Sequence, residues 1–160
     1  MKKTICVILA AALCALLNAC GSLEKEETAS ETLVDDPIIE EYYGGRERNE
    51  DGRFTTASAD KPYESSESAK LVSVSNIMKP GEIGSVVIDG YADVQYNVSV
   101  YNDYGKAFVF TESGRISADE NGRAVCPLSV PEDTPAGNYV ILLKQDGGSS
   151  YVLTVITVTQ

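Results

Sequence analysis

The chain has 160 residues, with 13 Lys and Arg against 24 Asp and Glu and a formal net charge of -11. This acidic balance argues against nucleic-acid binding, because phosphate recognition requires a basic surface. The chain contains no His, which removes the commonest general base and the commonest metal ligand together, and its length leaves room for one small domain.

The first 20 residues have the layout of a secretory leader, in which Lys2 and Lys3 precede an apolar run from Ile5 to Leu17. The run is too short to span a bilayer as a helix and lacks the polar face of an amphipathic core helix. Leu17-Asn18-Ala19-Cys20 then resembles the lipobox of bacterial lipoproteins. The resemblance implies a signal peptide over residues 1–19 and acyl chains on Cys20. These would anchor the protein to the cell membrane or outer membrane, outside the cytoplasm. Ordinary secretion is the alternative.

This leader accounts for three of the four cysteines. Cys6 and Cys14 leave with the signal peptide, and Cys20 is consumed by lipid. Only Cys126 remains, so we expect no intramolecular disulfide, and no metal or cofactor is predicted because metal-ligand spacings are absent. Cys126 lies in an apolar row and is expected to be a buried, unreactive thiol.

Residues 20–69 are expected to form a disordered acidic linker that begins with the lipidated Cys. Between residues 24 and 68 there are 14 acidic and five basic side chains, with no sustained hydrophobic period. The stretch over residues 37–45, PIIEEYYGG, is more apolar than its surroundings. It is either a chance enrichment or a short segment that orders on binding a partner or adds as a strand to a neighbouring sheet.

From residue 70 to residue 160, short apolar runs alternate with turn residues every 8 to 15 positions, which predicts an all-β sandwich or barrel. We expect about seven strands: Leu71–Met78, Gly84–Asp89, Val94–Tyr101, Lys106–Thr111, Arg123–Val130, Asn138–Lys144 and Ser150–Thr159. Alternation in two of them assigns these residues to the core: Val94, Tyr96, Val98, Val100, Ala124, Cys126, Leu128 and Val130. Asn121-Gly122 is the strongest hairpin signal.

The second half of this domain resembles the bacterial surface immunoglobulin-like domains. The resemblance rests on the pattern D-x-N-G-x-A at Asp119–Ala124, followed by P-x-x-T-P-x-G-x-Y at Pro131–Tyr139. It implies an immunoglobulin-like β-sandwich in an extracytoplasmic setting and no particular chemistry. Tyr139 would be either the tyrosine-corner residue of such sandwiches or an ordinary inward side chain beside Ile141 and Leu143.

These features predict a non-enzymatic, membrane-anchored surface module for adhesion or for binding an envelope or extracellular protein. The common nucleophile and phosphate-loop motifs are absent from the sequence. The alternative is a glycan or small-ligand site made by loop residues, namely Tyr91, Tyr101, Asn102, Asp103 and Tyr104. A carboxylate-based enzyme comes third. Calcium is the ion to consider, with oxygen ligands from Asp119, Glu120 and Asn121 or from Asp89 and Asp93.

Overall fold

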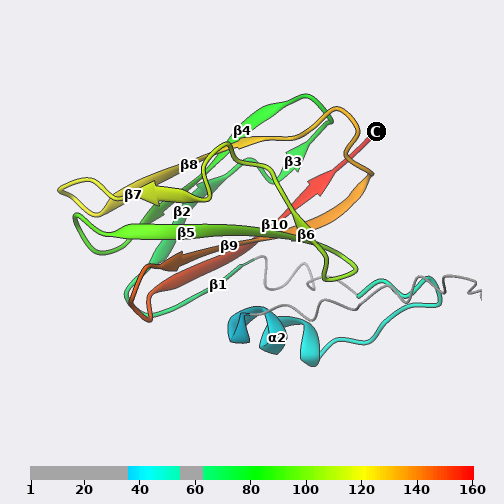
Figure 1. The fold of residues 1–160 in the computed structure, drawn as a ribbon, viewed down its shortest axis with the longest axis horizontal. Coiled ribbons are helices and arrows are strands. Elements are labelled where there is room, and N and C mark those ends of the chain that lie inside the picture. The colour runs from blue at the N-terminus through cyan, green and yellow to red at the C-terminus, as the bar shows by residue number, and fades with distance from the viewer. Residues whose placement is uncertain (1–35, 55–62) are drawn as a thin grey trace, which may run out of the picture. The chain divides into compact units, whose positions relative to one another are not determined.

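The computed structural model describes residues 36–54 and 63–160 (Figure 1). The predicted signal peptide, the predicted lipidation site Cys20 and the linker residues 20–35 and 55–62 lie outside them. The described residues belong to one compact unit, Thr32–Gln160. They form ten strands in two sheets and one short helix. The predicted all-β sandwich is therefore confirmed, and its architecture is consistent with the immunoglobulin-like class.

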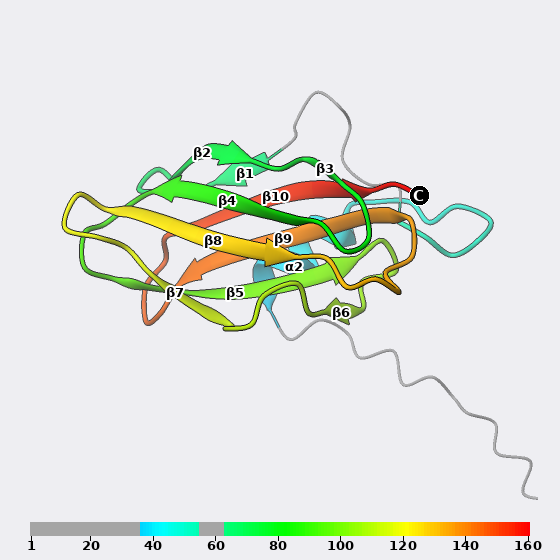
Figure 2. The same cartoon turned by 90° about the horizontal axis from the view of Figure 1, so that it is seen from above.

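The larger sheet has seven strands in the order β1-β10-β9-β5-β6, with β3 also pairing with β10 and β7 with β5, and the smaller sheet has the order β2-β4-β8. Figure 2 shows the two layers from above. Helix α2 spans Pro37–Gly44. The strands are β1 (Tyr63–Ser65), β2 (Lys70–Val74), β3 (Ile77–Met78), β4 (Ile83–Asp89), β5 (Gln95–Asn102), β6 (Ala107–Phe108), β7 (Arg115–Ser117), β8 (Arg123–Ser129), β9 (Gly137–Gln145) and β10 (Tyr151–Val158).

Each of the seven predicted segments contains strand, but two are divided or shortened. Leu71–Met78 splits into β2 and β3 because β2 pairs with β4 in the smaller sheet, whereas β3 pairs with β10 in the larger one. Lys106–Thr111 contains only the two-residue β6. The chain leaves the larger sheet after it, and the Phe110 carbonyl accepts a 2.7 Å hydrogen bond from the Ser129 N–H in β8. Strands β1 and β7 were not predicted.

The sandwich core contains the predicted alternating residues. In β8, Ala124, Cys126 and Leu128 are fully buried, and their neighbours in sequence point to solvent. In β5, Tyr96 and Val100 are buried and Val98 is partly buried against the same core cluster. Val94, which directly precedes β5, is partly buried there as well. The core assignments made from alternation are thus confirmed.

Strands β9 and β10 are buried on both faces. Ile141 and Leu143 point into the sandwich core, whereas Val140 and Leu142 belong to a second cluster, on the opposite face of the sheet. Leu153 of β10 lies in this second cluster. A strand that is buried on both faces has consecutive apolar residues in its sequence, without alternation. Residues 139–143 of β9, YVILL, have this pattern. The outer face of the larger sheet is therefore apolar and needs a cover.

Two predicted local features occur at the ends of the sheets. In the Asn121-Gly122 turn, the Asp119 carboxylate accepts hydrogen bonds from the N–H groups of Asn121 (2.9 Å) and Arg123 (2.8 Å), and Gly122 has a φ of 83°. The Tyr139 hydroxyl donates a 2.8 Å hydrogen bond to the carbonyl of Pro135, four residues upstream, as in a tyrosine corner. Tyr139 is also buried with Ile141, so both interpretations of this residue hold.

Strand β8 forms an edge of the smaller sheet, and Pro127 lies in its interior. The N–H groups of Arg123 and Ser129 donate to acceptors outside β4, namely Asp119 and Phe110. Main-chain groups alternate in direction along a strand, so the main-chain nitrogen of residue 127 points away from β4, as the N–H groups of residues 123 and 129 do. Proline has no N–H, so it fits this strand at a position where no ladder bond to β4 is lost.

Candidate interaction surfaces

Residues 36–54, which we call the strap, contain a helix that forms by recognisable local rules. The Asp36 side chain caps α2 by accepting a 2.9 Å hydrogen bond from the Ile38 N–H, and Pro37 occupies the first turn. The helix ends at Gly44, and the Gly45 N–H bonds to the carbonyl of Tyr43. A helix of eight residues is marginal in water, so this one depends on what it packs against.

Helix α2 packs on the outer face of the larger sheet, on the side away from the smaller sheet (Figure 1). Its buried residues, Ile39, Tyr42 and Tyr43, have exposed fractions of 0%, 6% and 4% and follow the i, i+3, i+4 spacing of a single helix face. They form one cluster with Val140, Leu142 and Leu153 of β9 and β10. The sheet face therefore gains the cover that its apolar side chains require.

The strap differs from the disordered linker expected over residues 20–69. Residues 36–54 lie against the sheet, and β1 (63–65) pairs with β10, so the folded unit begins before the expected boundary at residue 70. The stretch at residues 37–45 packs on the sheet as a helix, so the prediction that it adds as a strand is wrong. Composition suggested disorder because the segment alone has too little apolar surface to offset its ordering entropy. The missing surface comes from β9 and β10, more than 90 residues later in the chain.

Beyond α2 the strap makes a small polar turn and returns to the sheet. The Asn49 side chain accepts hydrogen bonds from the N–H groups of Asp51 (3.1 Å) and Arg53 (2.9 Å). Phe54 then donates its N–H to the carbonyl of Asp103 at 2.7 Å, and its ring lies 4.5 Å from that of Tyr43. The end of the strap is thus fastened to the β5–β6 hairpin.

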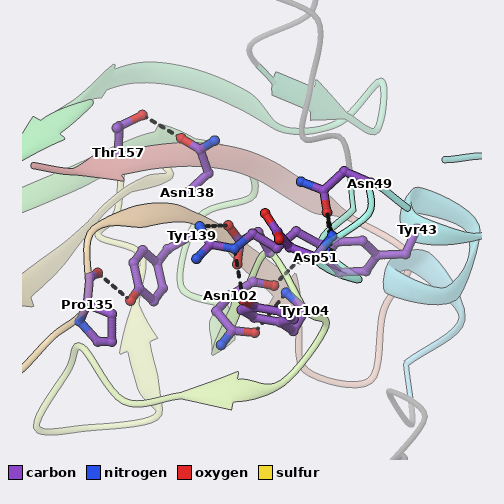
Figure 3. Close-up of polar contacts among 11 residues, drawn as sticks. Tyr43, Asn49, Asp51, Asn102, Tyr104, Pro135, Asn138, Tyr139 and Thr157 are labelled. Carbon is purple, nitrogen blue, oxygen red and sulfur yellow. Dashed lines mark hydrogen bonds and ion pairs between the residues drawn. The ribbon is translucent and has the colours of Figure 1, made fainter. Parts of the chain in front are cut away.

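The predicted ligand residues 101–104 form the tip of this hairpin. The Asn102 side chain closes the tip by accepting hydrogen bonds from the N–H groups of Tyr104 (3.1 Å) and Lys106 (2.9 Å). The carbonyl of Asn102 accepts a 2.9 Å hydrogen bond from the hydroxyl of Tyr43 in the strap. Figure 3 shows these residues converging between the hairpin and α2. Tyr101 packs against the strap cluster.

Asp103 is buried beneath the end of the strap. One of its carboxylate oxygens lies 3.6 Å from the Arg53 guanidinium, whose Nε donates a 2.8 Å hydrogen bond to the hydroxyl of Tyr104. Burial raises the pKa of the Asp103 carboxyl, and the charge of Arg53 partly opposes this shift. Burial also raises the pKa of the Tyr139 phenol, with a smaller contribution from Asp103. These polar groups hold the strap in place.

The fifth predicted residue, Tyr91, is not part of this cluster. It precedes β5, whereas residues 101–104 end it, and an eight-residue strand separates the two positions by roughly 25 Å. Tyr91 is 54% exposed. The structure therefore brings together four of the five predicted residues and finds them already in contact with the chain's own strap. The pairing of these residues with the strap was not predicted, although the apolar stretch at residues 37–45 had been singled out as a segment that could order against a partner or a sheet.

The carboxylates considered for calcium are engaged in local structure. Asp119 accepts the two turn hydrogen bonds described above, and Asp89 makes a bidentate ion pair with Arg123 at 2.9 and 3.1 Å. This pair lowers the pKa of the Asp89 carboxyl. Among residues 36–54 and 63–160, no three acidic or Cys side chains are grouped as a metal site would require.

A second surface is the outer face of the smaller sheet, which we call the open face. Val87 of β4 lies directly opposite Val125 of β8, which is 54% exposed, and Pro127 follows on the same face. Val72 is 46% exposed at a bulge in β2, and Ile83 is 83% exposed at the start of β4. A solvated sheet face normally carries polar residues. Here Ser73 and Ser85 lie opposite Val87 and Pro127, so the apolar group is small and has polar neighbours on the same face.

A groove of about 410 Å³ adjoins the open face where the chain crosses between the sheets. Phe110 and Leu128 line its apolar part, and it shares Ile83 and Pro127 with the open face. Arg115 lines it as well and pairs with Asp146 at 3.8 Å. The open face and the groove are therefore continuous.

No family model matches the chain, and no curated protein is similar to it in sequence. Solved structures that resemble it include the sulfur carrier protein SoxY from Chlorobium limicola f thiosulfatophilum, with 11% identity over 59% of this chain and 82% of that chain and a TM-score of 0.34. A chimeric titin Z1Z2 protein has 15% identity over 61% and 96% of the two chains, with a TM-score of 0.33. A beta-glucosidase from Listeria innocua has 11% identity over 74% of this chain and 21% of its own, with a TM-score of 0.36. TM-scores this low carry no argument about function.

Proposed function

We propose that the protein is a non-enzymatic lipoprotein, anchored through Cys20, whose immunoglobulin-like sandwich binds another protein of the cell envelope. The open face carries this proposal. It is an apolar row on a sheet face that the described part of the chain leaves uncovered, whereas the outer face of the larger sheet is covered by the strap.

The open face has the layout of a protein-binding surface. Val87 and Val125 form an apolar centre, and the ion pair between Asp89 and Arg123 lies at one end of the same strands. Protein interfaces have this arrangement of an apolar core and a polar rim. Contiguous exposed apolar side chains on a soluble domain usually mark such contacts. The open face thus favours a protein partner over a glycan bound at the hairpin tip.

The anchor is supported by the lipobox-like sequence before Cys20. Fifteen residues separate Cys20 from Asp36, where the strap begins. No helix among residues 36–54 and 63–160 is long and apolar enough to cross a bilayer. Replacing Cys20 with Ser should move the protein from the membrane fraction to the soluble fraction. Retention of the variant in the membrane would contradict lipid anchoring.

Binding at the open face is tested by site-specific photocrosslinking in intact cells. A photoreactive residue in place of Val125 should give a discrete crosslinked product with a different protein, and the same residue in place of the exposed Lys106 should not give that product. Adding Val87→Glu should abolish the product, because a charge in the apolar centre lacks a partner. An equal pattern at both positions, or no product from Val125, would refute the open face as the binding surface.

A further inference from the structure

The outer face of the larger sheet binds the strap, a segment of the same chain. Any second copy of the chain carries the same strap and the same face. We propose that neighbouring copies exchange straps, so that residues 36–54 of one copy dock on the larger sheet of another and link the two. This rests on the proposed function, because anchored copies share one membrane.

The fit between strap and face depends on side chains that are identical in every copy. Ile39, Tyr42 and Tyr43 are buried against β9 and β10. Lys144 of β9 forms a 2.8 Å ion pair with Asp36, the residue that caps α2. A strap from a second copy would make each of these contacts unchanged.

The strap is separable from the sheet because its attachment is local. Among the described residues, no β-ladder joins the strap to a strand, and its one bridge, between Arg48 and Phe54, is internal. It is fastened by the α2 cluster, by the Lys144–Asp36 ion pair and by the contacts of Tyr43, Arg53 and Phe54 with the β5–β6 hairpin. Strands β9 and β10, by contrast, are paired along eight residues. The sandwich can therefore persist while the strap changes its partner.

The connection between the strap and β1 limits how far the strap can reach from its own sandwich. Eight residues, 55–62, join the strap to β1, and nine extended links reach about 30 Å. When two copies exchange straps reciprocally, each described strap contact is kept, and the cost lies in the entropy of the connections and in the translational and rotational freedom lost on dimerisation. Anchoring in one membrane raises the effective concentration of each copy for the other, which favours the exchanged form.

The experiment mixes two full-length chains that carry different tags in the same cells. One bears Asp36→Cys and the other Lys144→Cys, and a short bifunctional maleimide then links the two positions. Only a strap docked on the other copy brings these residues together. We expect a heterodimer several-fold above the background given by the first chain with wild type. A chain bearing both substitutions shows that the pair is within reach, through its internal crosslink.

Two matched variants make the result specific. Glu132→Cys, at an exposed site beyond β8, replaces Lys144→Cys as a control and should give only background. Tyr43→Ala in the strap donor should lower the heterodimer yield several-fold. An internal crosslink in the double variant with only background in the mixture would overturn strap exchange. Fractionation of the same cells tests the anchor separately, because an unanchored protein appears in the soluble fraction.

Discussion

Replacing Tyr43 with Ala measures how strongly the strap is held. The Tyr43 ring is 4% exposed, contacts the rings of Tyr42 (5.1 Å between centroids) and Phe54 (4.5 Å), and donates its hydroxyl to the Asn102 carbonyl. Truncating a buried aromatic residue to Ala costs about 3–5 kcal/mol. The hydrogen bond contributes about 0.5–1.5 kcal/mol of this. Because Tyr43 lies outside the sandwich core, strap docking should bear the cost.

Amide hydrogen exchange measures, segment by segment, where the free energy lost in Tyr43→Ala lowers protection. A loss of about 3–5 kcal/mol raises the undocked population by roughly two to three and a half orders of magnitude, since each 1.4 kcal/mol is tenfold. Amides of α2 should therefore lose protection in Tyr43→Ala, whereas those of β8 keep theirs. Tyr43→Phe should lose only the part due to the hydroxyl. Tyr91→Ala, at an exposed site, should change stability by less than about 0.5 kcal/mol.

Two results would refute this reasoning. Unchanged protection of α2 in Tyr43→Ala would mean that the aromatic contacts contribute little to docking. An equal loss of protection in β8 would mean that strap and sandwich unfold together, which would also remove the basis for strap exchange.

Three further predictions concern pH, the thiol and a turn. Burial raises the pKa of the Tyr43 phenol, so the contribution of this group to strap docking should be constant below about pH 10, the unfolded value, and should be lost as the pH rises above it. The circular dichroism signal of α2 should therefore fall less at high pH in Tyr43→Phe, and identical curves would contradict this. Burial raises the pKa of the Cys126 thiol to about 11, so it should react with a disulfide reagent only after denaturation, and rapid native labelling would disprove burial. Gly122→Ala should lower the free energy of unfolding more than Gly147→Ala, because both have positive φ but only Gly122 faces a main-chain oxygen, that of Gly90. Gly147→Ala should cost about 1–2 kcal/mol, and equal losses in denaturant titrations would exclude the clash.

Much of the sandwich could be predicted because its signals are local. Alternation in β5 and β8 assigned core residues correctly, since a strand with one solvated face repeats every two residues. The Asn121-Gly122 turn was recognisable because its conformation depends on the residues within it. β7, in contrast, has three residues and takes its conformation from pairing with β5.

The strap could not be predicted in the same way. Its helix depends on a sheet face more than 90 residues away, and no local pattern encodes that distance. The run at residues 139–143 did carry a signal, because consecutive apolar residues in a strand require cover on both faces. Combining that run with the apolar stretch at 37–45 would have suggested that the two pack together. The predicted ligand site at residues 101–104 marked the place where the strap is fastened.

Pro127 has a consequence for how one copy of this domain meets another. Edge strands with free N–H groups can template the addition of further chains, which leads to aggregates and fibrils. At β8 the proline removes one donor from that edge, while Arg123 and Ser129 have theirs occupied. The β8 edge is therefore a poor template for main-chain pairing with a strand of another copy, whereas contacts between side-chain surfaces remain open to it.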